Sequence, residues 1–262
     1  KIIITGGAGF IGTNFVHYYS KNFENDEIFV IDSLTYAGNL SNLRDLINNS
    51  KVTFIKGDIN DRQFLESYIR EKKINYILNF AAESHVDRSI KTPNNFIKTN
   101  IEGTFNLLDV FKNYWIENNS PSHWRFLHIS TDEVFGSLKL SDRKFNENSK
   151  YCPRSPYSAS KAASDHLVMA WFHTYGLPVI ISNCSNNYGP FQFPEKLIPK
   201  TIISCLRREK IPVYGSGKNI RDWLFVNDHV RALCKLIHKA KPGKKYCIGG
   251  QGETTNIEIV NI

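Results

Sequence analysis

The chain has 262 residues, a length that suits one large α/β domain or one domain with a smaller lobe. Hydrophobic residues make up 41% of it and can fill a sizeable core, which argues against intrinsic disorder. The formal net charge is +8, but no basic stripe interleaved with aromatic residues accompanies it, so we expect no nucleic-acid partner. The charge indicates solvated faces or, alternatively, attraction of an anionic small ligand.

The lengths of the apolar stretches and the spacing of the cysteines argue against membrane proteins, disulfide-rich proteins and zinc proteins. No apolar run reaches the length of a membrane span, and the chain enters a strand directly without a signal-peptide pattern, so we expect no membrane association. The five cysteines form no C-x-x-C pair, which argues against a disulfide framework and a zinc site. We therefore expect no metal and a cytoplasmic location.

Short apolar runs alternate with helix-like stretches along most of the chain. The runs suit buried parallel strands at 1–5, 27–31, 52–56, 76–80, 125–130 and 179–182. Between them we predict helices at 11–21, 40–48, 62–72, 94–114 and 157–175. Each strand and helix together have the length of a βαβ unit, so the predicted fold is α/β, a doubly wound parallel Rossmann-type sheet.

After residue 182 the alternation loosens, and several prolines interrupt irregular segments. This change predicts a smaller substrate-binding lobe over the carboxyl edge of the sheet, where open α/β sheets bind ligands. We expect an NAD-binding domain at 1–184 and a sugar-nucleotide-binding lobe at 185–262. The two are partly interleaved, with residues from about 224 to 250 returning to the first domain.

The first predicted strand leads into a glycine-rich loop. Gly7, Gly9 and Gly12 match G-x-G-x-x-G, which gives a tight turn, bare backbone beneath a pyrophosphate and close packing of helix on strand. Alone the pattern is weak and could be a fortuitous turn. Here it lies between a strand and a helix, and Asp32 follows Gly12 by twenty residues. An acid there accepts hydrogen bonds from ribose and repels a 2′-phosphate, so NAD is favoured over NADP.

Two further strand ends fit a dinucleotide site. Asp58 follows the third strand and either caps the adenine edge or serves as a turn aspartate. Phe80, Ala81 and Ala82 leave the fourth strand, and the two alanines are small enough for backbone to approach a cofactor closely. We interpret the neighbouring His85 as a packed side chain rather than a catalytic base.

Tyr157 and Lys161 stand four residues apart on a predicted helix, so the phenol and the ammonium share one face. A nearby cation favours the phenolate and lowers the pKa of the tyrosine. Such a tyrosine can remove a proton from a sugar hydroxyl during oxidation. The pair alone could be an ordinary surface pair, but it follows a complete dinucleotide pattern.

At the end of the fifth predicted strand, Asp132 and Glu133 stand side by side after Thr131. Adjacent carboxylates repel each other, so a purely structural turn would more cheaply use one of them. The pair is therefore either a solvated turn or part of a reaction that needs two acids.

The glycine loop, the Tyr157/Lys161 pair and the stretch 187–190 (NYGP) resemble the extended short-chain dehydrogenase/reductase family that acts on nucleotide sugars. More narrowly, 32–39, 81–89, 130–134 and 183–190 resemble the dTDP-glucose 4,6-dehydratases, and 193–199 and 217–223 extend the likeness into the second lobe. The resemblance covers nearly the whole chain. It implies an NAD-dependent hydro-lyase.

The reaction that the resemblance implies converts a nucleoside-diphosphate hexose (dTDP-glucose, with UDP-glucose open) into the 4-keto-6-deoxy sugar. C4 is oxidised, water is lost across C5–C6, and the hydride returns to C6. Thr131 would hydrogen-bond O4, and Tyr157 would take its proton. Glu133 would remove the C5 proton while a protonated Asp132 donates to the leaving C6 hydroxyl. Adjacent acids of unequal pKa can supply this base and this acid.

The resemblance also assigns binding residues. The cofactor would contact Gly6, Gly7, Gly9, Phe10, Ile11, Gly12, Asp32, Ser33, Leu34, Thr35, Asp58, Ile59, Phe80, Ala81, Ala82, Ser84, Thr99, Tyr157, Lys161 and, at the nicotinamide end, Asn187. The substrate would contact Ser84, Thr131, Asn186, Lys196, Leu197, Pro212, Val213, Tyr214, Arg221 and Asn256. Arg221 could instead form a surface ion pair with Asp222.

Several expectations rest on likeness alone. The helices at 94–114 and 157–175 resemble those of a four-helix homodimer interface. The chain ends at Ile262 within what looks like the start of a helix, whereas the family continues, so we expect a truncated C-terminus. The alternatives are a nucleotide-sugar 4-epimerase or decarboxylase of the same family, which would be expected to lack the Asp132/Glu133 pair, or a non-catalytic NAD-sensing protein.

Overall fold

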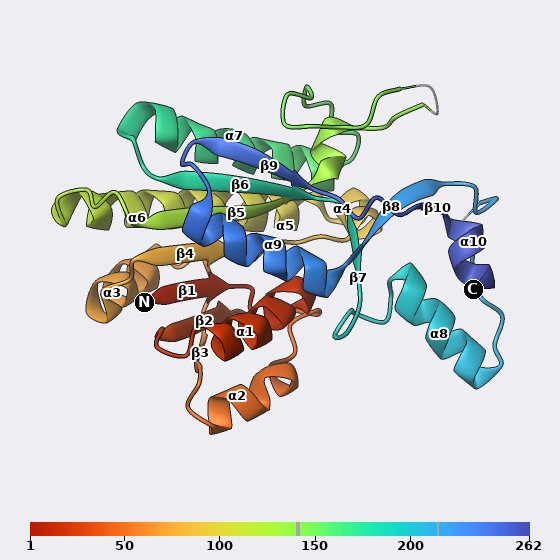
Figure 1. Cartoon of the computed structure of the whole chain (residues 1–262), viewed down its shortest axis with the longest axis horizontal. Helices are drawn as coiled ribbons and strands as arrows, with labels where there is room; N and C mark the ends of the chain where they lie inside the picture. Colours follow the sequence, from red (N-terminus) through yellow and green to blue (C-terminus); the bar gives the residue numbers. More distant parts are fainter. Residues whose placement is uncertain (140–141, 214) are drawn as a thin grey trace.

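In the computed structural model, which describes residues 1–139, 142–213 and 215–262, a seven-stranded parallel sheet forms the centre of the main body (Figure 1). Its strands, in spatial order, are β3 (Thr53–Lys56), β2 (Ile28–Asp32), β1 (Ile2–Thr5), β4 (Tyr76–Asn79), β5 (Arg125–Thr131), β6 (Val179–Cys184) and β9 (Lys244–Ile248). The strand order reverses between β1 and β4, as in a doubly wound sheet. The predicted fold class is confirmed.

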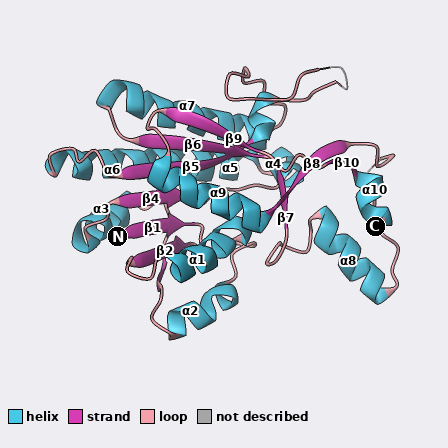
Figure 2. Ribbon diagram, in the orientation of Figure 1, coloured by secondary structure: helices cyan, strands magenta, loops and turns pink. Residues whose placement is uncertain are grey.

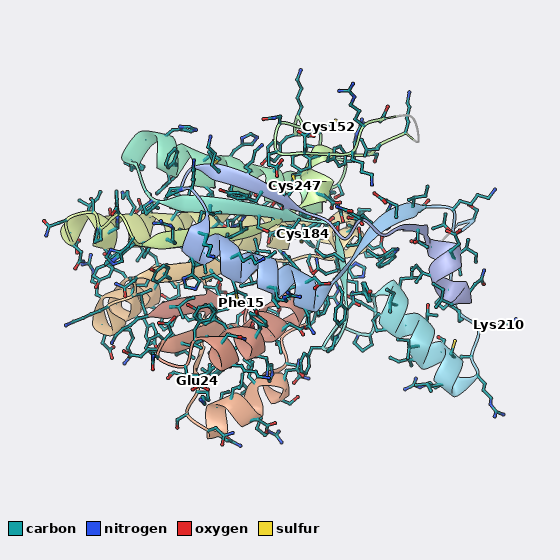
Figure 3. All side chains as sticks on the ribbon, viewed as in Figure 1. Phe15, Glu24, Cys152, Cys184, Lys210 and Cys247 are labelled. Carbon is teal, nitrogen blue, oxygen red and sulfur yellow. The ribbon has the colours of Figure 1, made fainter. Side chains whose placement is uncertain are left out.

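Helices cover both faces of this sheet (Figure 2). One face packs against α3 (Arg62–Lys72), α6 (Thr104–Glu117) and α7 (Pro156–Tyr175), and the other against α1 (Phe10–Asn22) and α9 (Val226–Lys239). Successive side chains of a strand point to opposite faces. In β1, Ile3 therefore joins the core beneath α6, whereas Ile2 and Ile4 join Phe15 of α1 (labelled in Figure 3).

Short helices connect these layers. They are η1 (Leu40–Leu43), α2 (Arg44–Asn48), α4 (Val86–Lys91), α5 (Pro93–Phe96), the π-helix η2 (Ile97–Gly103) and the 3-10 helix η3 (Asp132–Phe135). The single helix predicted at 94–114 is thus three consecutive segments. In η2 the buried Asn100 donates to the Glu83 carbonyl and accepts from the Glu83 N–H, which ties the helix to the loop after β4.

A smaller lobe lies beside the carboxyl edge of the large sheet, on the right in Figure 1. Its three strands are ordered β10 (Glu253–Thr255), β8 (Ile220–Phe225) and β7 (Asn186–Tyr188), and its helices are α8 (Leu197–Arg207) and α10 (Asn256–Asn261). Between β8 and β10 the chain adds α9 and β9 to the main body. The exposed basic run 207–210 lies at the end of α8, with Lys210 at the tip of the lobe (Figure 3).

Nothing in the described part of the chain forms a helix both long enough and apolar enough to cross a membrane.

Candidate active site

A cavity of about 470 Å³ opens at the carboxyl ends of the parallel strands, where side chains of the second lobe complete its wall. Open α/β sheets bind their ligands at this edge. All five predicted catalytic residues line the cavity: Thr131, Asp132, Glu133, Tyr157 and Lys161. They come from the end of β5, from η3 and from the first turns of α7.

The glycine-rich loop forms one end of the cavity and leaves no room for side chains. A Cβ atom at Gly6 would lie 2.6 Å from the Ala81 nitrogen, and one at Gly12 would lie 2.4 Å from the Gly6 oxygen. Helix α1 starts directly after Gly9, which supplies no side-chain cap, so the first N–H groups of the helix are left for an anion. These features fit the pyrophosphate of a dinucleotide.

Asp32 holds the same loop together from the end of β2. One carboxylate oxygen accepts a hydrogen bond from the Ala8 N–H at 2.9 Å, and the other accepts one from the Leu34 N–H at 2.8 Å. Each oxygen keeps a second lone pair for a ribose hydroxyl. Burial raises the pKa of Asp32, and the two backbone N–H donors oppose this rise.

Most of the other residues assigned to the cofactor line the cavity as well: Gly9, Phe10, Ile11, Ser33, Thr35, Asp58, Ile59, Phe80, Ala81, Ala82, Ser84, Thr99 and Asn187. Gly7 and Leu34 do not. A Cβ at Gly7 would point into the core, 2.6 Å from Val30 Cγ1. Asp58 is a turn residue, because its Oδ1 accepts from the Asn60 N–H at 2.9 Å. It also lines the cavity wall.

Tyr157 and Lys161 lie on one face of α7, as the spacing predicts. The Lys161 ammonium is buried, donates to the Ile129 carbonyl at 2.8 Å, and lies 3.3 Å from His128 Nε2. Burial lowers the pKa of Lys161 to about 8, although the Asp165 carboxylate opposes this. The pKa of Tyr157 is raised, first by burial and then by the Glu133 charge, so the predicted lowering by Lys161 is not found.

Thr131 ends β5 and caps the short helix that carries the two acids. Its Oγ1 accepts from the Glu133 N–H at 3.2 Å and lies 3.4 Å from Asp132 Oδ1. Both carboxyl groups are partly buried and face the cavity. This placement does not fit the alternative of a solvated turn.

The surroundings of the two acids differ. Burial, and then the charge of Glu133, raise the pKa of Asp132 to about 6. Burial also raises the pKa of Glu133, but the positive charges of Arg221 and Lys196 oppose that rise. The Arg221 charge opposes the rise at Asp132 as well, but there it is weaker than burial and the charge of the neighbouring Glu133. Lys196 adds a second cation beside Glu133.

The second lobe supplies the remaining wall. The predicted substrate residues on the wall are Ser84, Thr131, Asn186, Lys196, Leu197, Arg221 and Asn256. Pro212 and Val213 do not line the cavity, and Tyr214 lies outside the described residues. Within the described chain Arg221 makes no ion pair with Asp222, whose carboxylate instead accepts from the Gly250 and Gly252 N–H groups.

Sequence reasoning assigned no role to several wall residues, among them Glu83, Glu195 and Trp223. Glu83 and Glu195 directly precede Ser84 and Lys196, two residues assigned to the site, and this proximity in sequence could have indicated them. Trp223 gave no comparable signal, because only the pairing of β8 with β7 brings it to the cavity. The described residues contain no group of three His, Cys, Asp or Glu side chains that could hold a metal ion.

Comparisons with known proteins agree with this geometry. Residues 3–262 match the family model described as GDP-mannose 4,6 dehydratase. The dTDP-glucose 4,6-dehydratase of Neisseria meningitidis is 52% identical over 262 residues, which are 99% of this chain and 74% of that protein. A crystal structure of dTDP-glucose 4,6-dehydratase from Bacillus anthracis in complex with NAD has a TM-score of 0.89 and 45% identity, covering 99% of this chain and 78% of that one. The dTDP-glucose 4,6-dehydratase of Streptomyces venezuelae, also with NAD bound, has a TM-score of 0.92 and 42% identity, with coverages of 99% and 79%.

Proposed function

The chain belongs to the GDP-mannose 4,6-dehydratase family and catalyses the NAD-dependent dehydration of dTDP-glucose, and we propose that Tyr157, Asp132 and Glu133 carry its proton transfers. The product is the 4-keto-6-deoxy sugar. The observation that supports these roles is the placement of two adjacent acids with opposed surroundings on the cavity wall.

The first step is oxidation at C4. Tyr157 removes the O4 proton, and Thr131, whose hydroxyl lines the same wall, orients that oxygen. Lys161 donates one hydrogen bond to the Ile129 carbonyl and has further N–H groups for the cofactor ribose. NAD⁺, when held by the glycine loop, Asp32 and Lys161, would supply the redox chemistry of the reaction as a hydride acceptor for C4 and a hydride donor for C6.

The second step is loss of water across C5–C6. Glu133 is the base for C5: burial raises its pKa, but the charges of Arg221 and Lys196 oppose that rise and favour the carboxylate. Asp132 is the acid for the C6 hydroxyl, because burial and the Glu133 charge favour its protonated form. A 4-epimerase or simple dehydrogenase needs neither group, so the pair favours dehydration over these alternatives.

The second lobe binds the rest of the substrate. Arg221 and Lys196 line the cavity and are suited to a diphosphate, since a guanidinium offers a planar fork of donors and an ammonium a compact charge. We assign residues 1–184 with about 224–250 to the NAD-binding domain, and the remaining residues to the sugar-nucleotide-binding lobe. The free thiols of all five cysteines agree with a cytoplasmic enzyme.

We also propose that the protein is a homodimer. Ile97, Phe105 and Tyr175 expose 44%, 40% and 45% of their surface on η2, α6 and α7. Trp171 links two of them, with ring centroids 5.7 Å from Phe105 and 5.6 Å from Tyr175. This apolar and aromatic face is suited to a second copy of the same helices.

The test separates the two acids. Asp132→Asn cannot donate a carboxylic proton, and Glu133→Gln cannot act as a base, but both variants should still oxidise C4. We expect water loss to slow by ~100-fold or more in each, the range for one positioned proton-transfer group. Solvent deuterium should enter C5 faster in Asp132→Asn, which keeps the base. Single-turnover absorbance and mass spectrometry of the sugar report both effects, and parent rates of water loss in both variants would refute the assignment.

A further inference from the structure

His229 is a fully buried histidine to which neither step of the reaction assigns a role. It lies in the first turn of α9, which packs beside β7 at the junction of the two lobes (Figure 1). Its Nδ1 is 2.8 Å from Oδ1 of Asn187, and its Nε2 has no hydrogen-bond partner among the described residues. Burial lowers the pKa of His229 to about 3, so the imidazole is neutral.

The hydrogen bonds around Asn187 determine which nitrogen carries the proton. Asn187 Nδ2 donates to the Ser185 carbonyl at 3.0 Å, and a carbonyl can only accept. The amide nitrogen therefore faces Ser185, and the amide oxygen faces His229. Since that oxygen can only accept, His229 must carry its proton on Nδ1, which leaves Nε2 as a buried acceptor without a partner.

Stability does not explain a histidine at this position. A buried acceptor without a partner costs free energy. Neighbouring buried positions of α9 hold the apolar residues Val226, Val230 and Leu233. An apolar residue would satisfy the packing without that cost. Among the described residues, the one polar contact of the His229 side chain is with Asn187, which lines the cavity.

We propose that His229 is a positioning residue that fixes the Asn187 side-chain amide so that its second N–H faces the nicotinamide end of NAD. The inference rests on the proposed function, in which Asn187 contacts that end of the cofactor. Two of the polar groups of the Asn187 amide are held by the protein, the oxygen by His229 and one N–H by Ser185. The other N–H lies beside the Cys184 thiol, a weak acceptor that leaves this N–H available to a ligand. Without His229 the amide could rotate or flip.

The experiment measures NAD affinity by calorimetry on the chain freed of bound nucleotide. His229→Leu removes the donor and fills similar space, and we expect NAD to bind about three- to tenfold more weakly, the range for one neutral hydrogen bond. His229→Asn places an amide near the position of Nδ1 and should stay within about twofold of the parent. His229→Gln places its amide near the position of Nε2 and should resemble His229→Leu. Leu233→Met, a packing change on the same helix, should leave affinity unchanged.

A double-mutant cycle shows whether His229 acts through Asn187. In an Asn187→Ala background, His229→Leu should change NAD affinity by less than about twofold. Equal losses in both backgrounds, or no loss in either, would overturn the proposal. A parent chain that binds NAD but does not dehydrate the sugar would refute the proposed function and leave this cycle interpretable.

Discussion

Asp132, the proposed proton donor, lies where its charge costs the fold free energy. Its carboxyl group lies in surroundings that oppose its charge, with Glu133 beside it and little water around it. A residue chosen for stability would be neutral there. A proton donor for a leaving hydroxyl needs a raised pKa, and the same surroundings that disfavour the charge supply it.

We predict that Asp132→Asn stabilises the protein above about pH 6. The folded-state pKa of Asp132 is about 6 and its ordinary value is 3.8, so between these values the folded chain holds a proton that the unfolded chain has lost. Stability therefore falls as pH rises through this window, by on the order of 3 kcal/mol in total. The variant lacks this loss, and its advantage should be full above about pH 6 and vanish below about pH 4.

Urea denaturation across about pH 4 to 8 measures this difference. Asp228→Asn is the matched control, because Asp228 lies on α9 with 62% of its side chain exposed and should gain nothing. A gain in Asp132→Asn that is the same at every pH would point to packing or hydrogen bonding instead of charge.

Tyr157→Phe should block the first oxidation, because no other group on the described wall is placed to take the O4 proton in the proposed mechanism. We expect a loss of at least ~100-fold in the single-turnover rate at which the absorbance of the reduced cofactor appears. Tyr18→Phe removes a phenol from helix α1 that does not line the cavity and should leave that rate unchanged. A near-parent rate in Tyr157→Phe would mean that the proton leaves by another route.

At the scale of elements, the start of α7 positions Tyr157, the proposed base for O4. Ser155 caps the helix and accepts from the Ser158 N–H at 3.0 Å, Ser158 completes a capping box, and Pro156 occupies the first helical position. Tyr157 follows Pro156 directly, so the cap that fixes the start of the helix also fixes the position of the Tyr157 side chain. A weakened cap should therefore affect both stability and the site.

Ser155→Ala should lower the free energy of unfolding by about 1 kcal/mol, the usual cost of losing an N-cap. Urea denaturation measures the loss, and Ser155→Thr, which keeps the capping oxygen, should recover most of it. If the threonine variant is as unstable as the alanine variant, the cap is not the source of the effect.

The helices and strands also show which boundaries the local hydrophobic pattern can predict and which it cannot. The first six strands and α3 were predicted to within two residues. Strands β1, β2, β4, β5 and β6 are short apolar runs that are almost wholly buried, whereas β3 is more exposed. Helix α3 instead shows helical spacing, with the buried Leu65 and Ile69 four residues apart. The π-helix η2 was missed, because it lies inside a stretch that we predicted as one continuous helix. Its last residue, Gly103, packs against Ile59, where a Cβ would lie 2.4 Å from Cδ1. Strand β9 was missed because its sequence begins with lysines and its partner β6 lies about sixty residues earlier.

At the scale of the whole molecule, the site is assembled from parts that are remote in sequence. The glycine loop and the Thr131–Glu133 segment could be assigned locally, because each follows a recognisable strand. The proximity of Arg221 to Glu133 could not, since it depends on how β8 joins the second lobe to the sheet edge. The Arg221 charge opposes the rise in pKa at both Asp132 and Glu133, and the Lys196 charge opposes it at Glu133. The different roles that we propose for the two acids therefore depend in part on charges from the second lobe.

The assembly of two chains is the remaining expectation at this scale. We predict that the protein sediments as a dimer and that Phe105→Glu converts it to a monomer, because a charge would be buried unpaired between the helices α6 and α7 of the two copies. Leu206→Glu is the control: Leu206 is 80% exposed on α8, in the other lobe, and its substitution should leave the dimer intact. Sedimentation velocity at several concentrations, with circular dichroism to show that both variants remain folded, measures the outcome. If Phe105→Glu sediments as the parent does, the aromatic face on α6 and α7 is not the dimer interface.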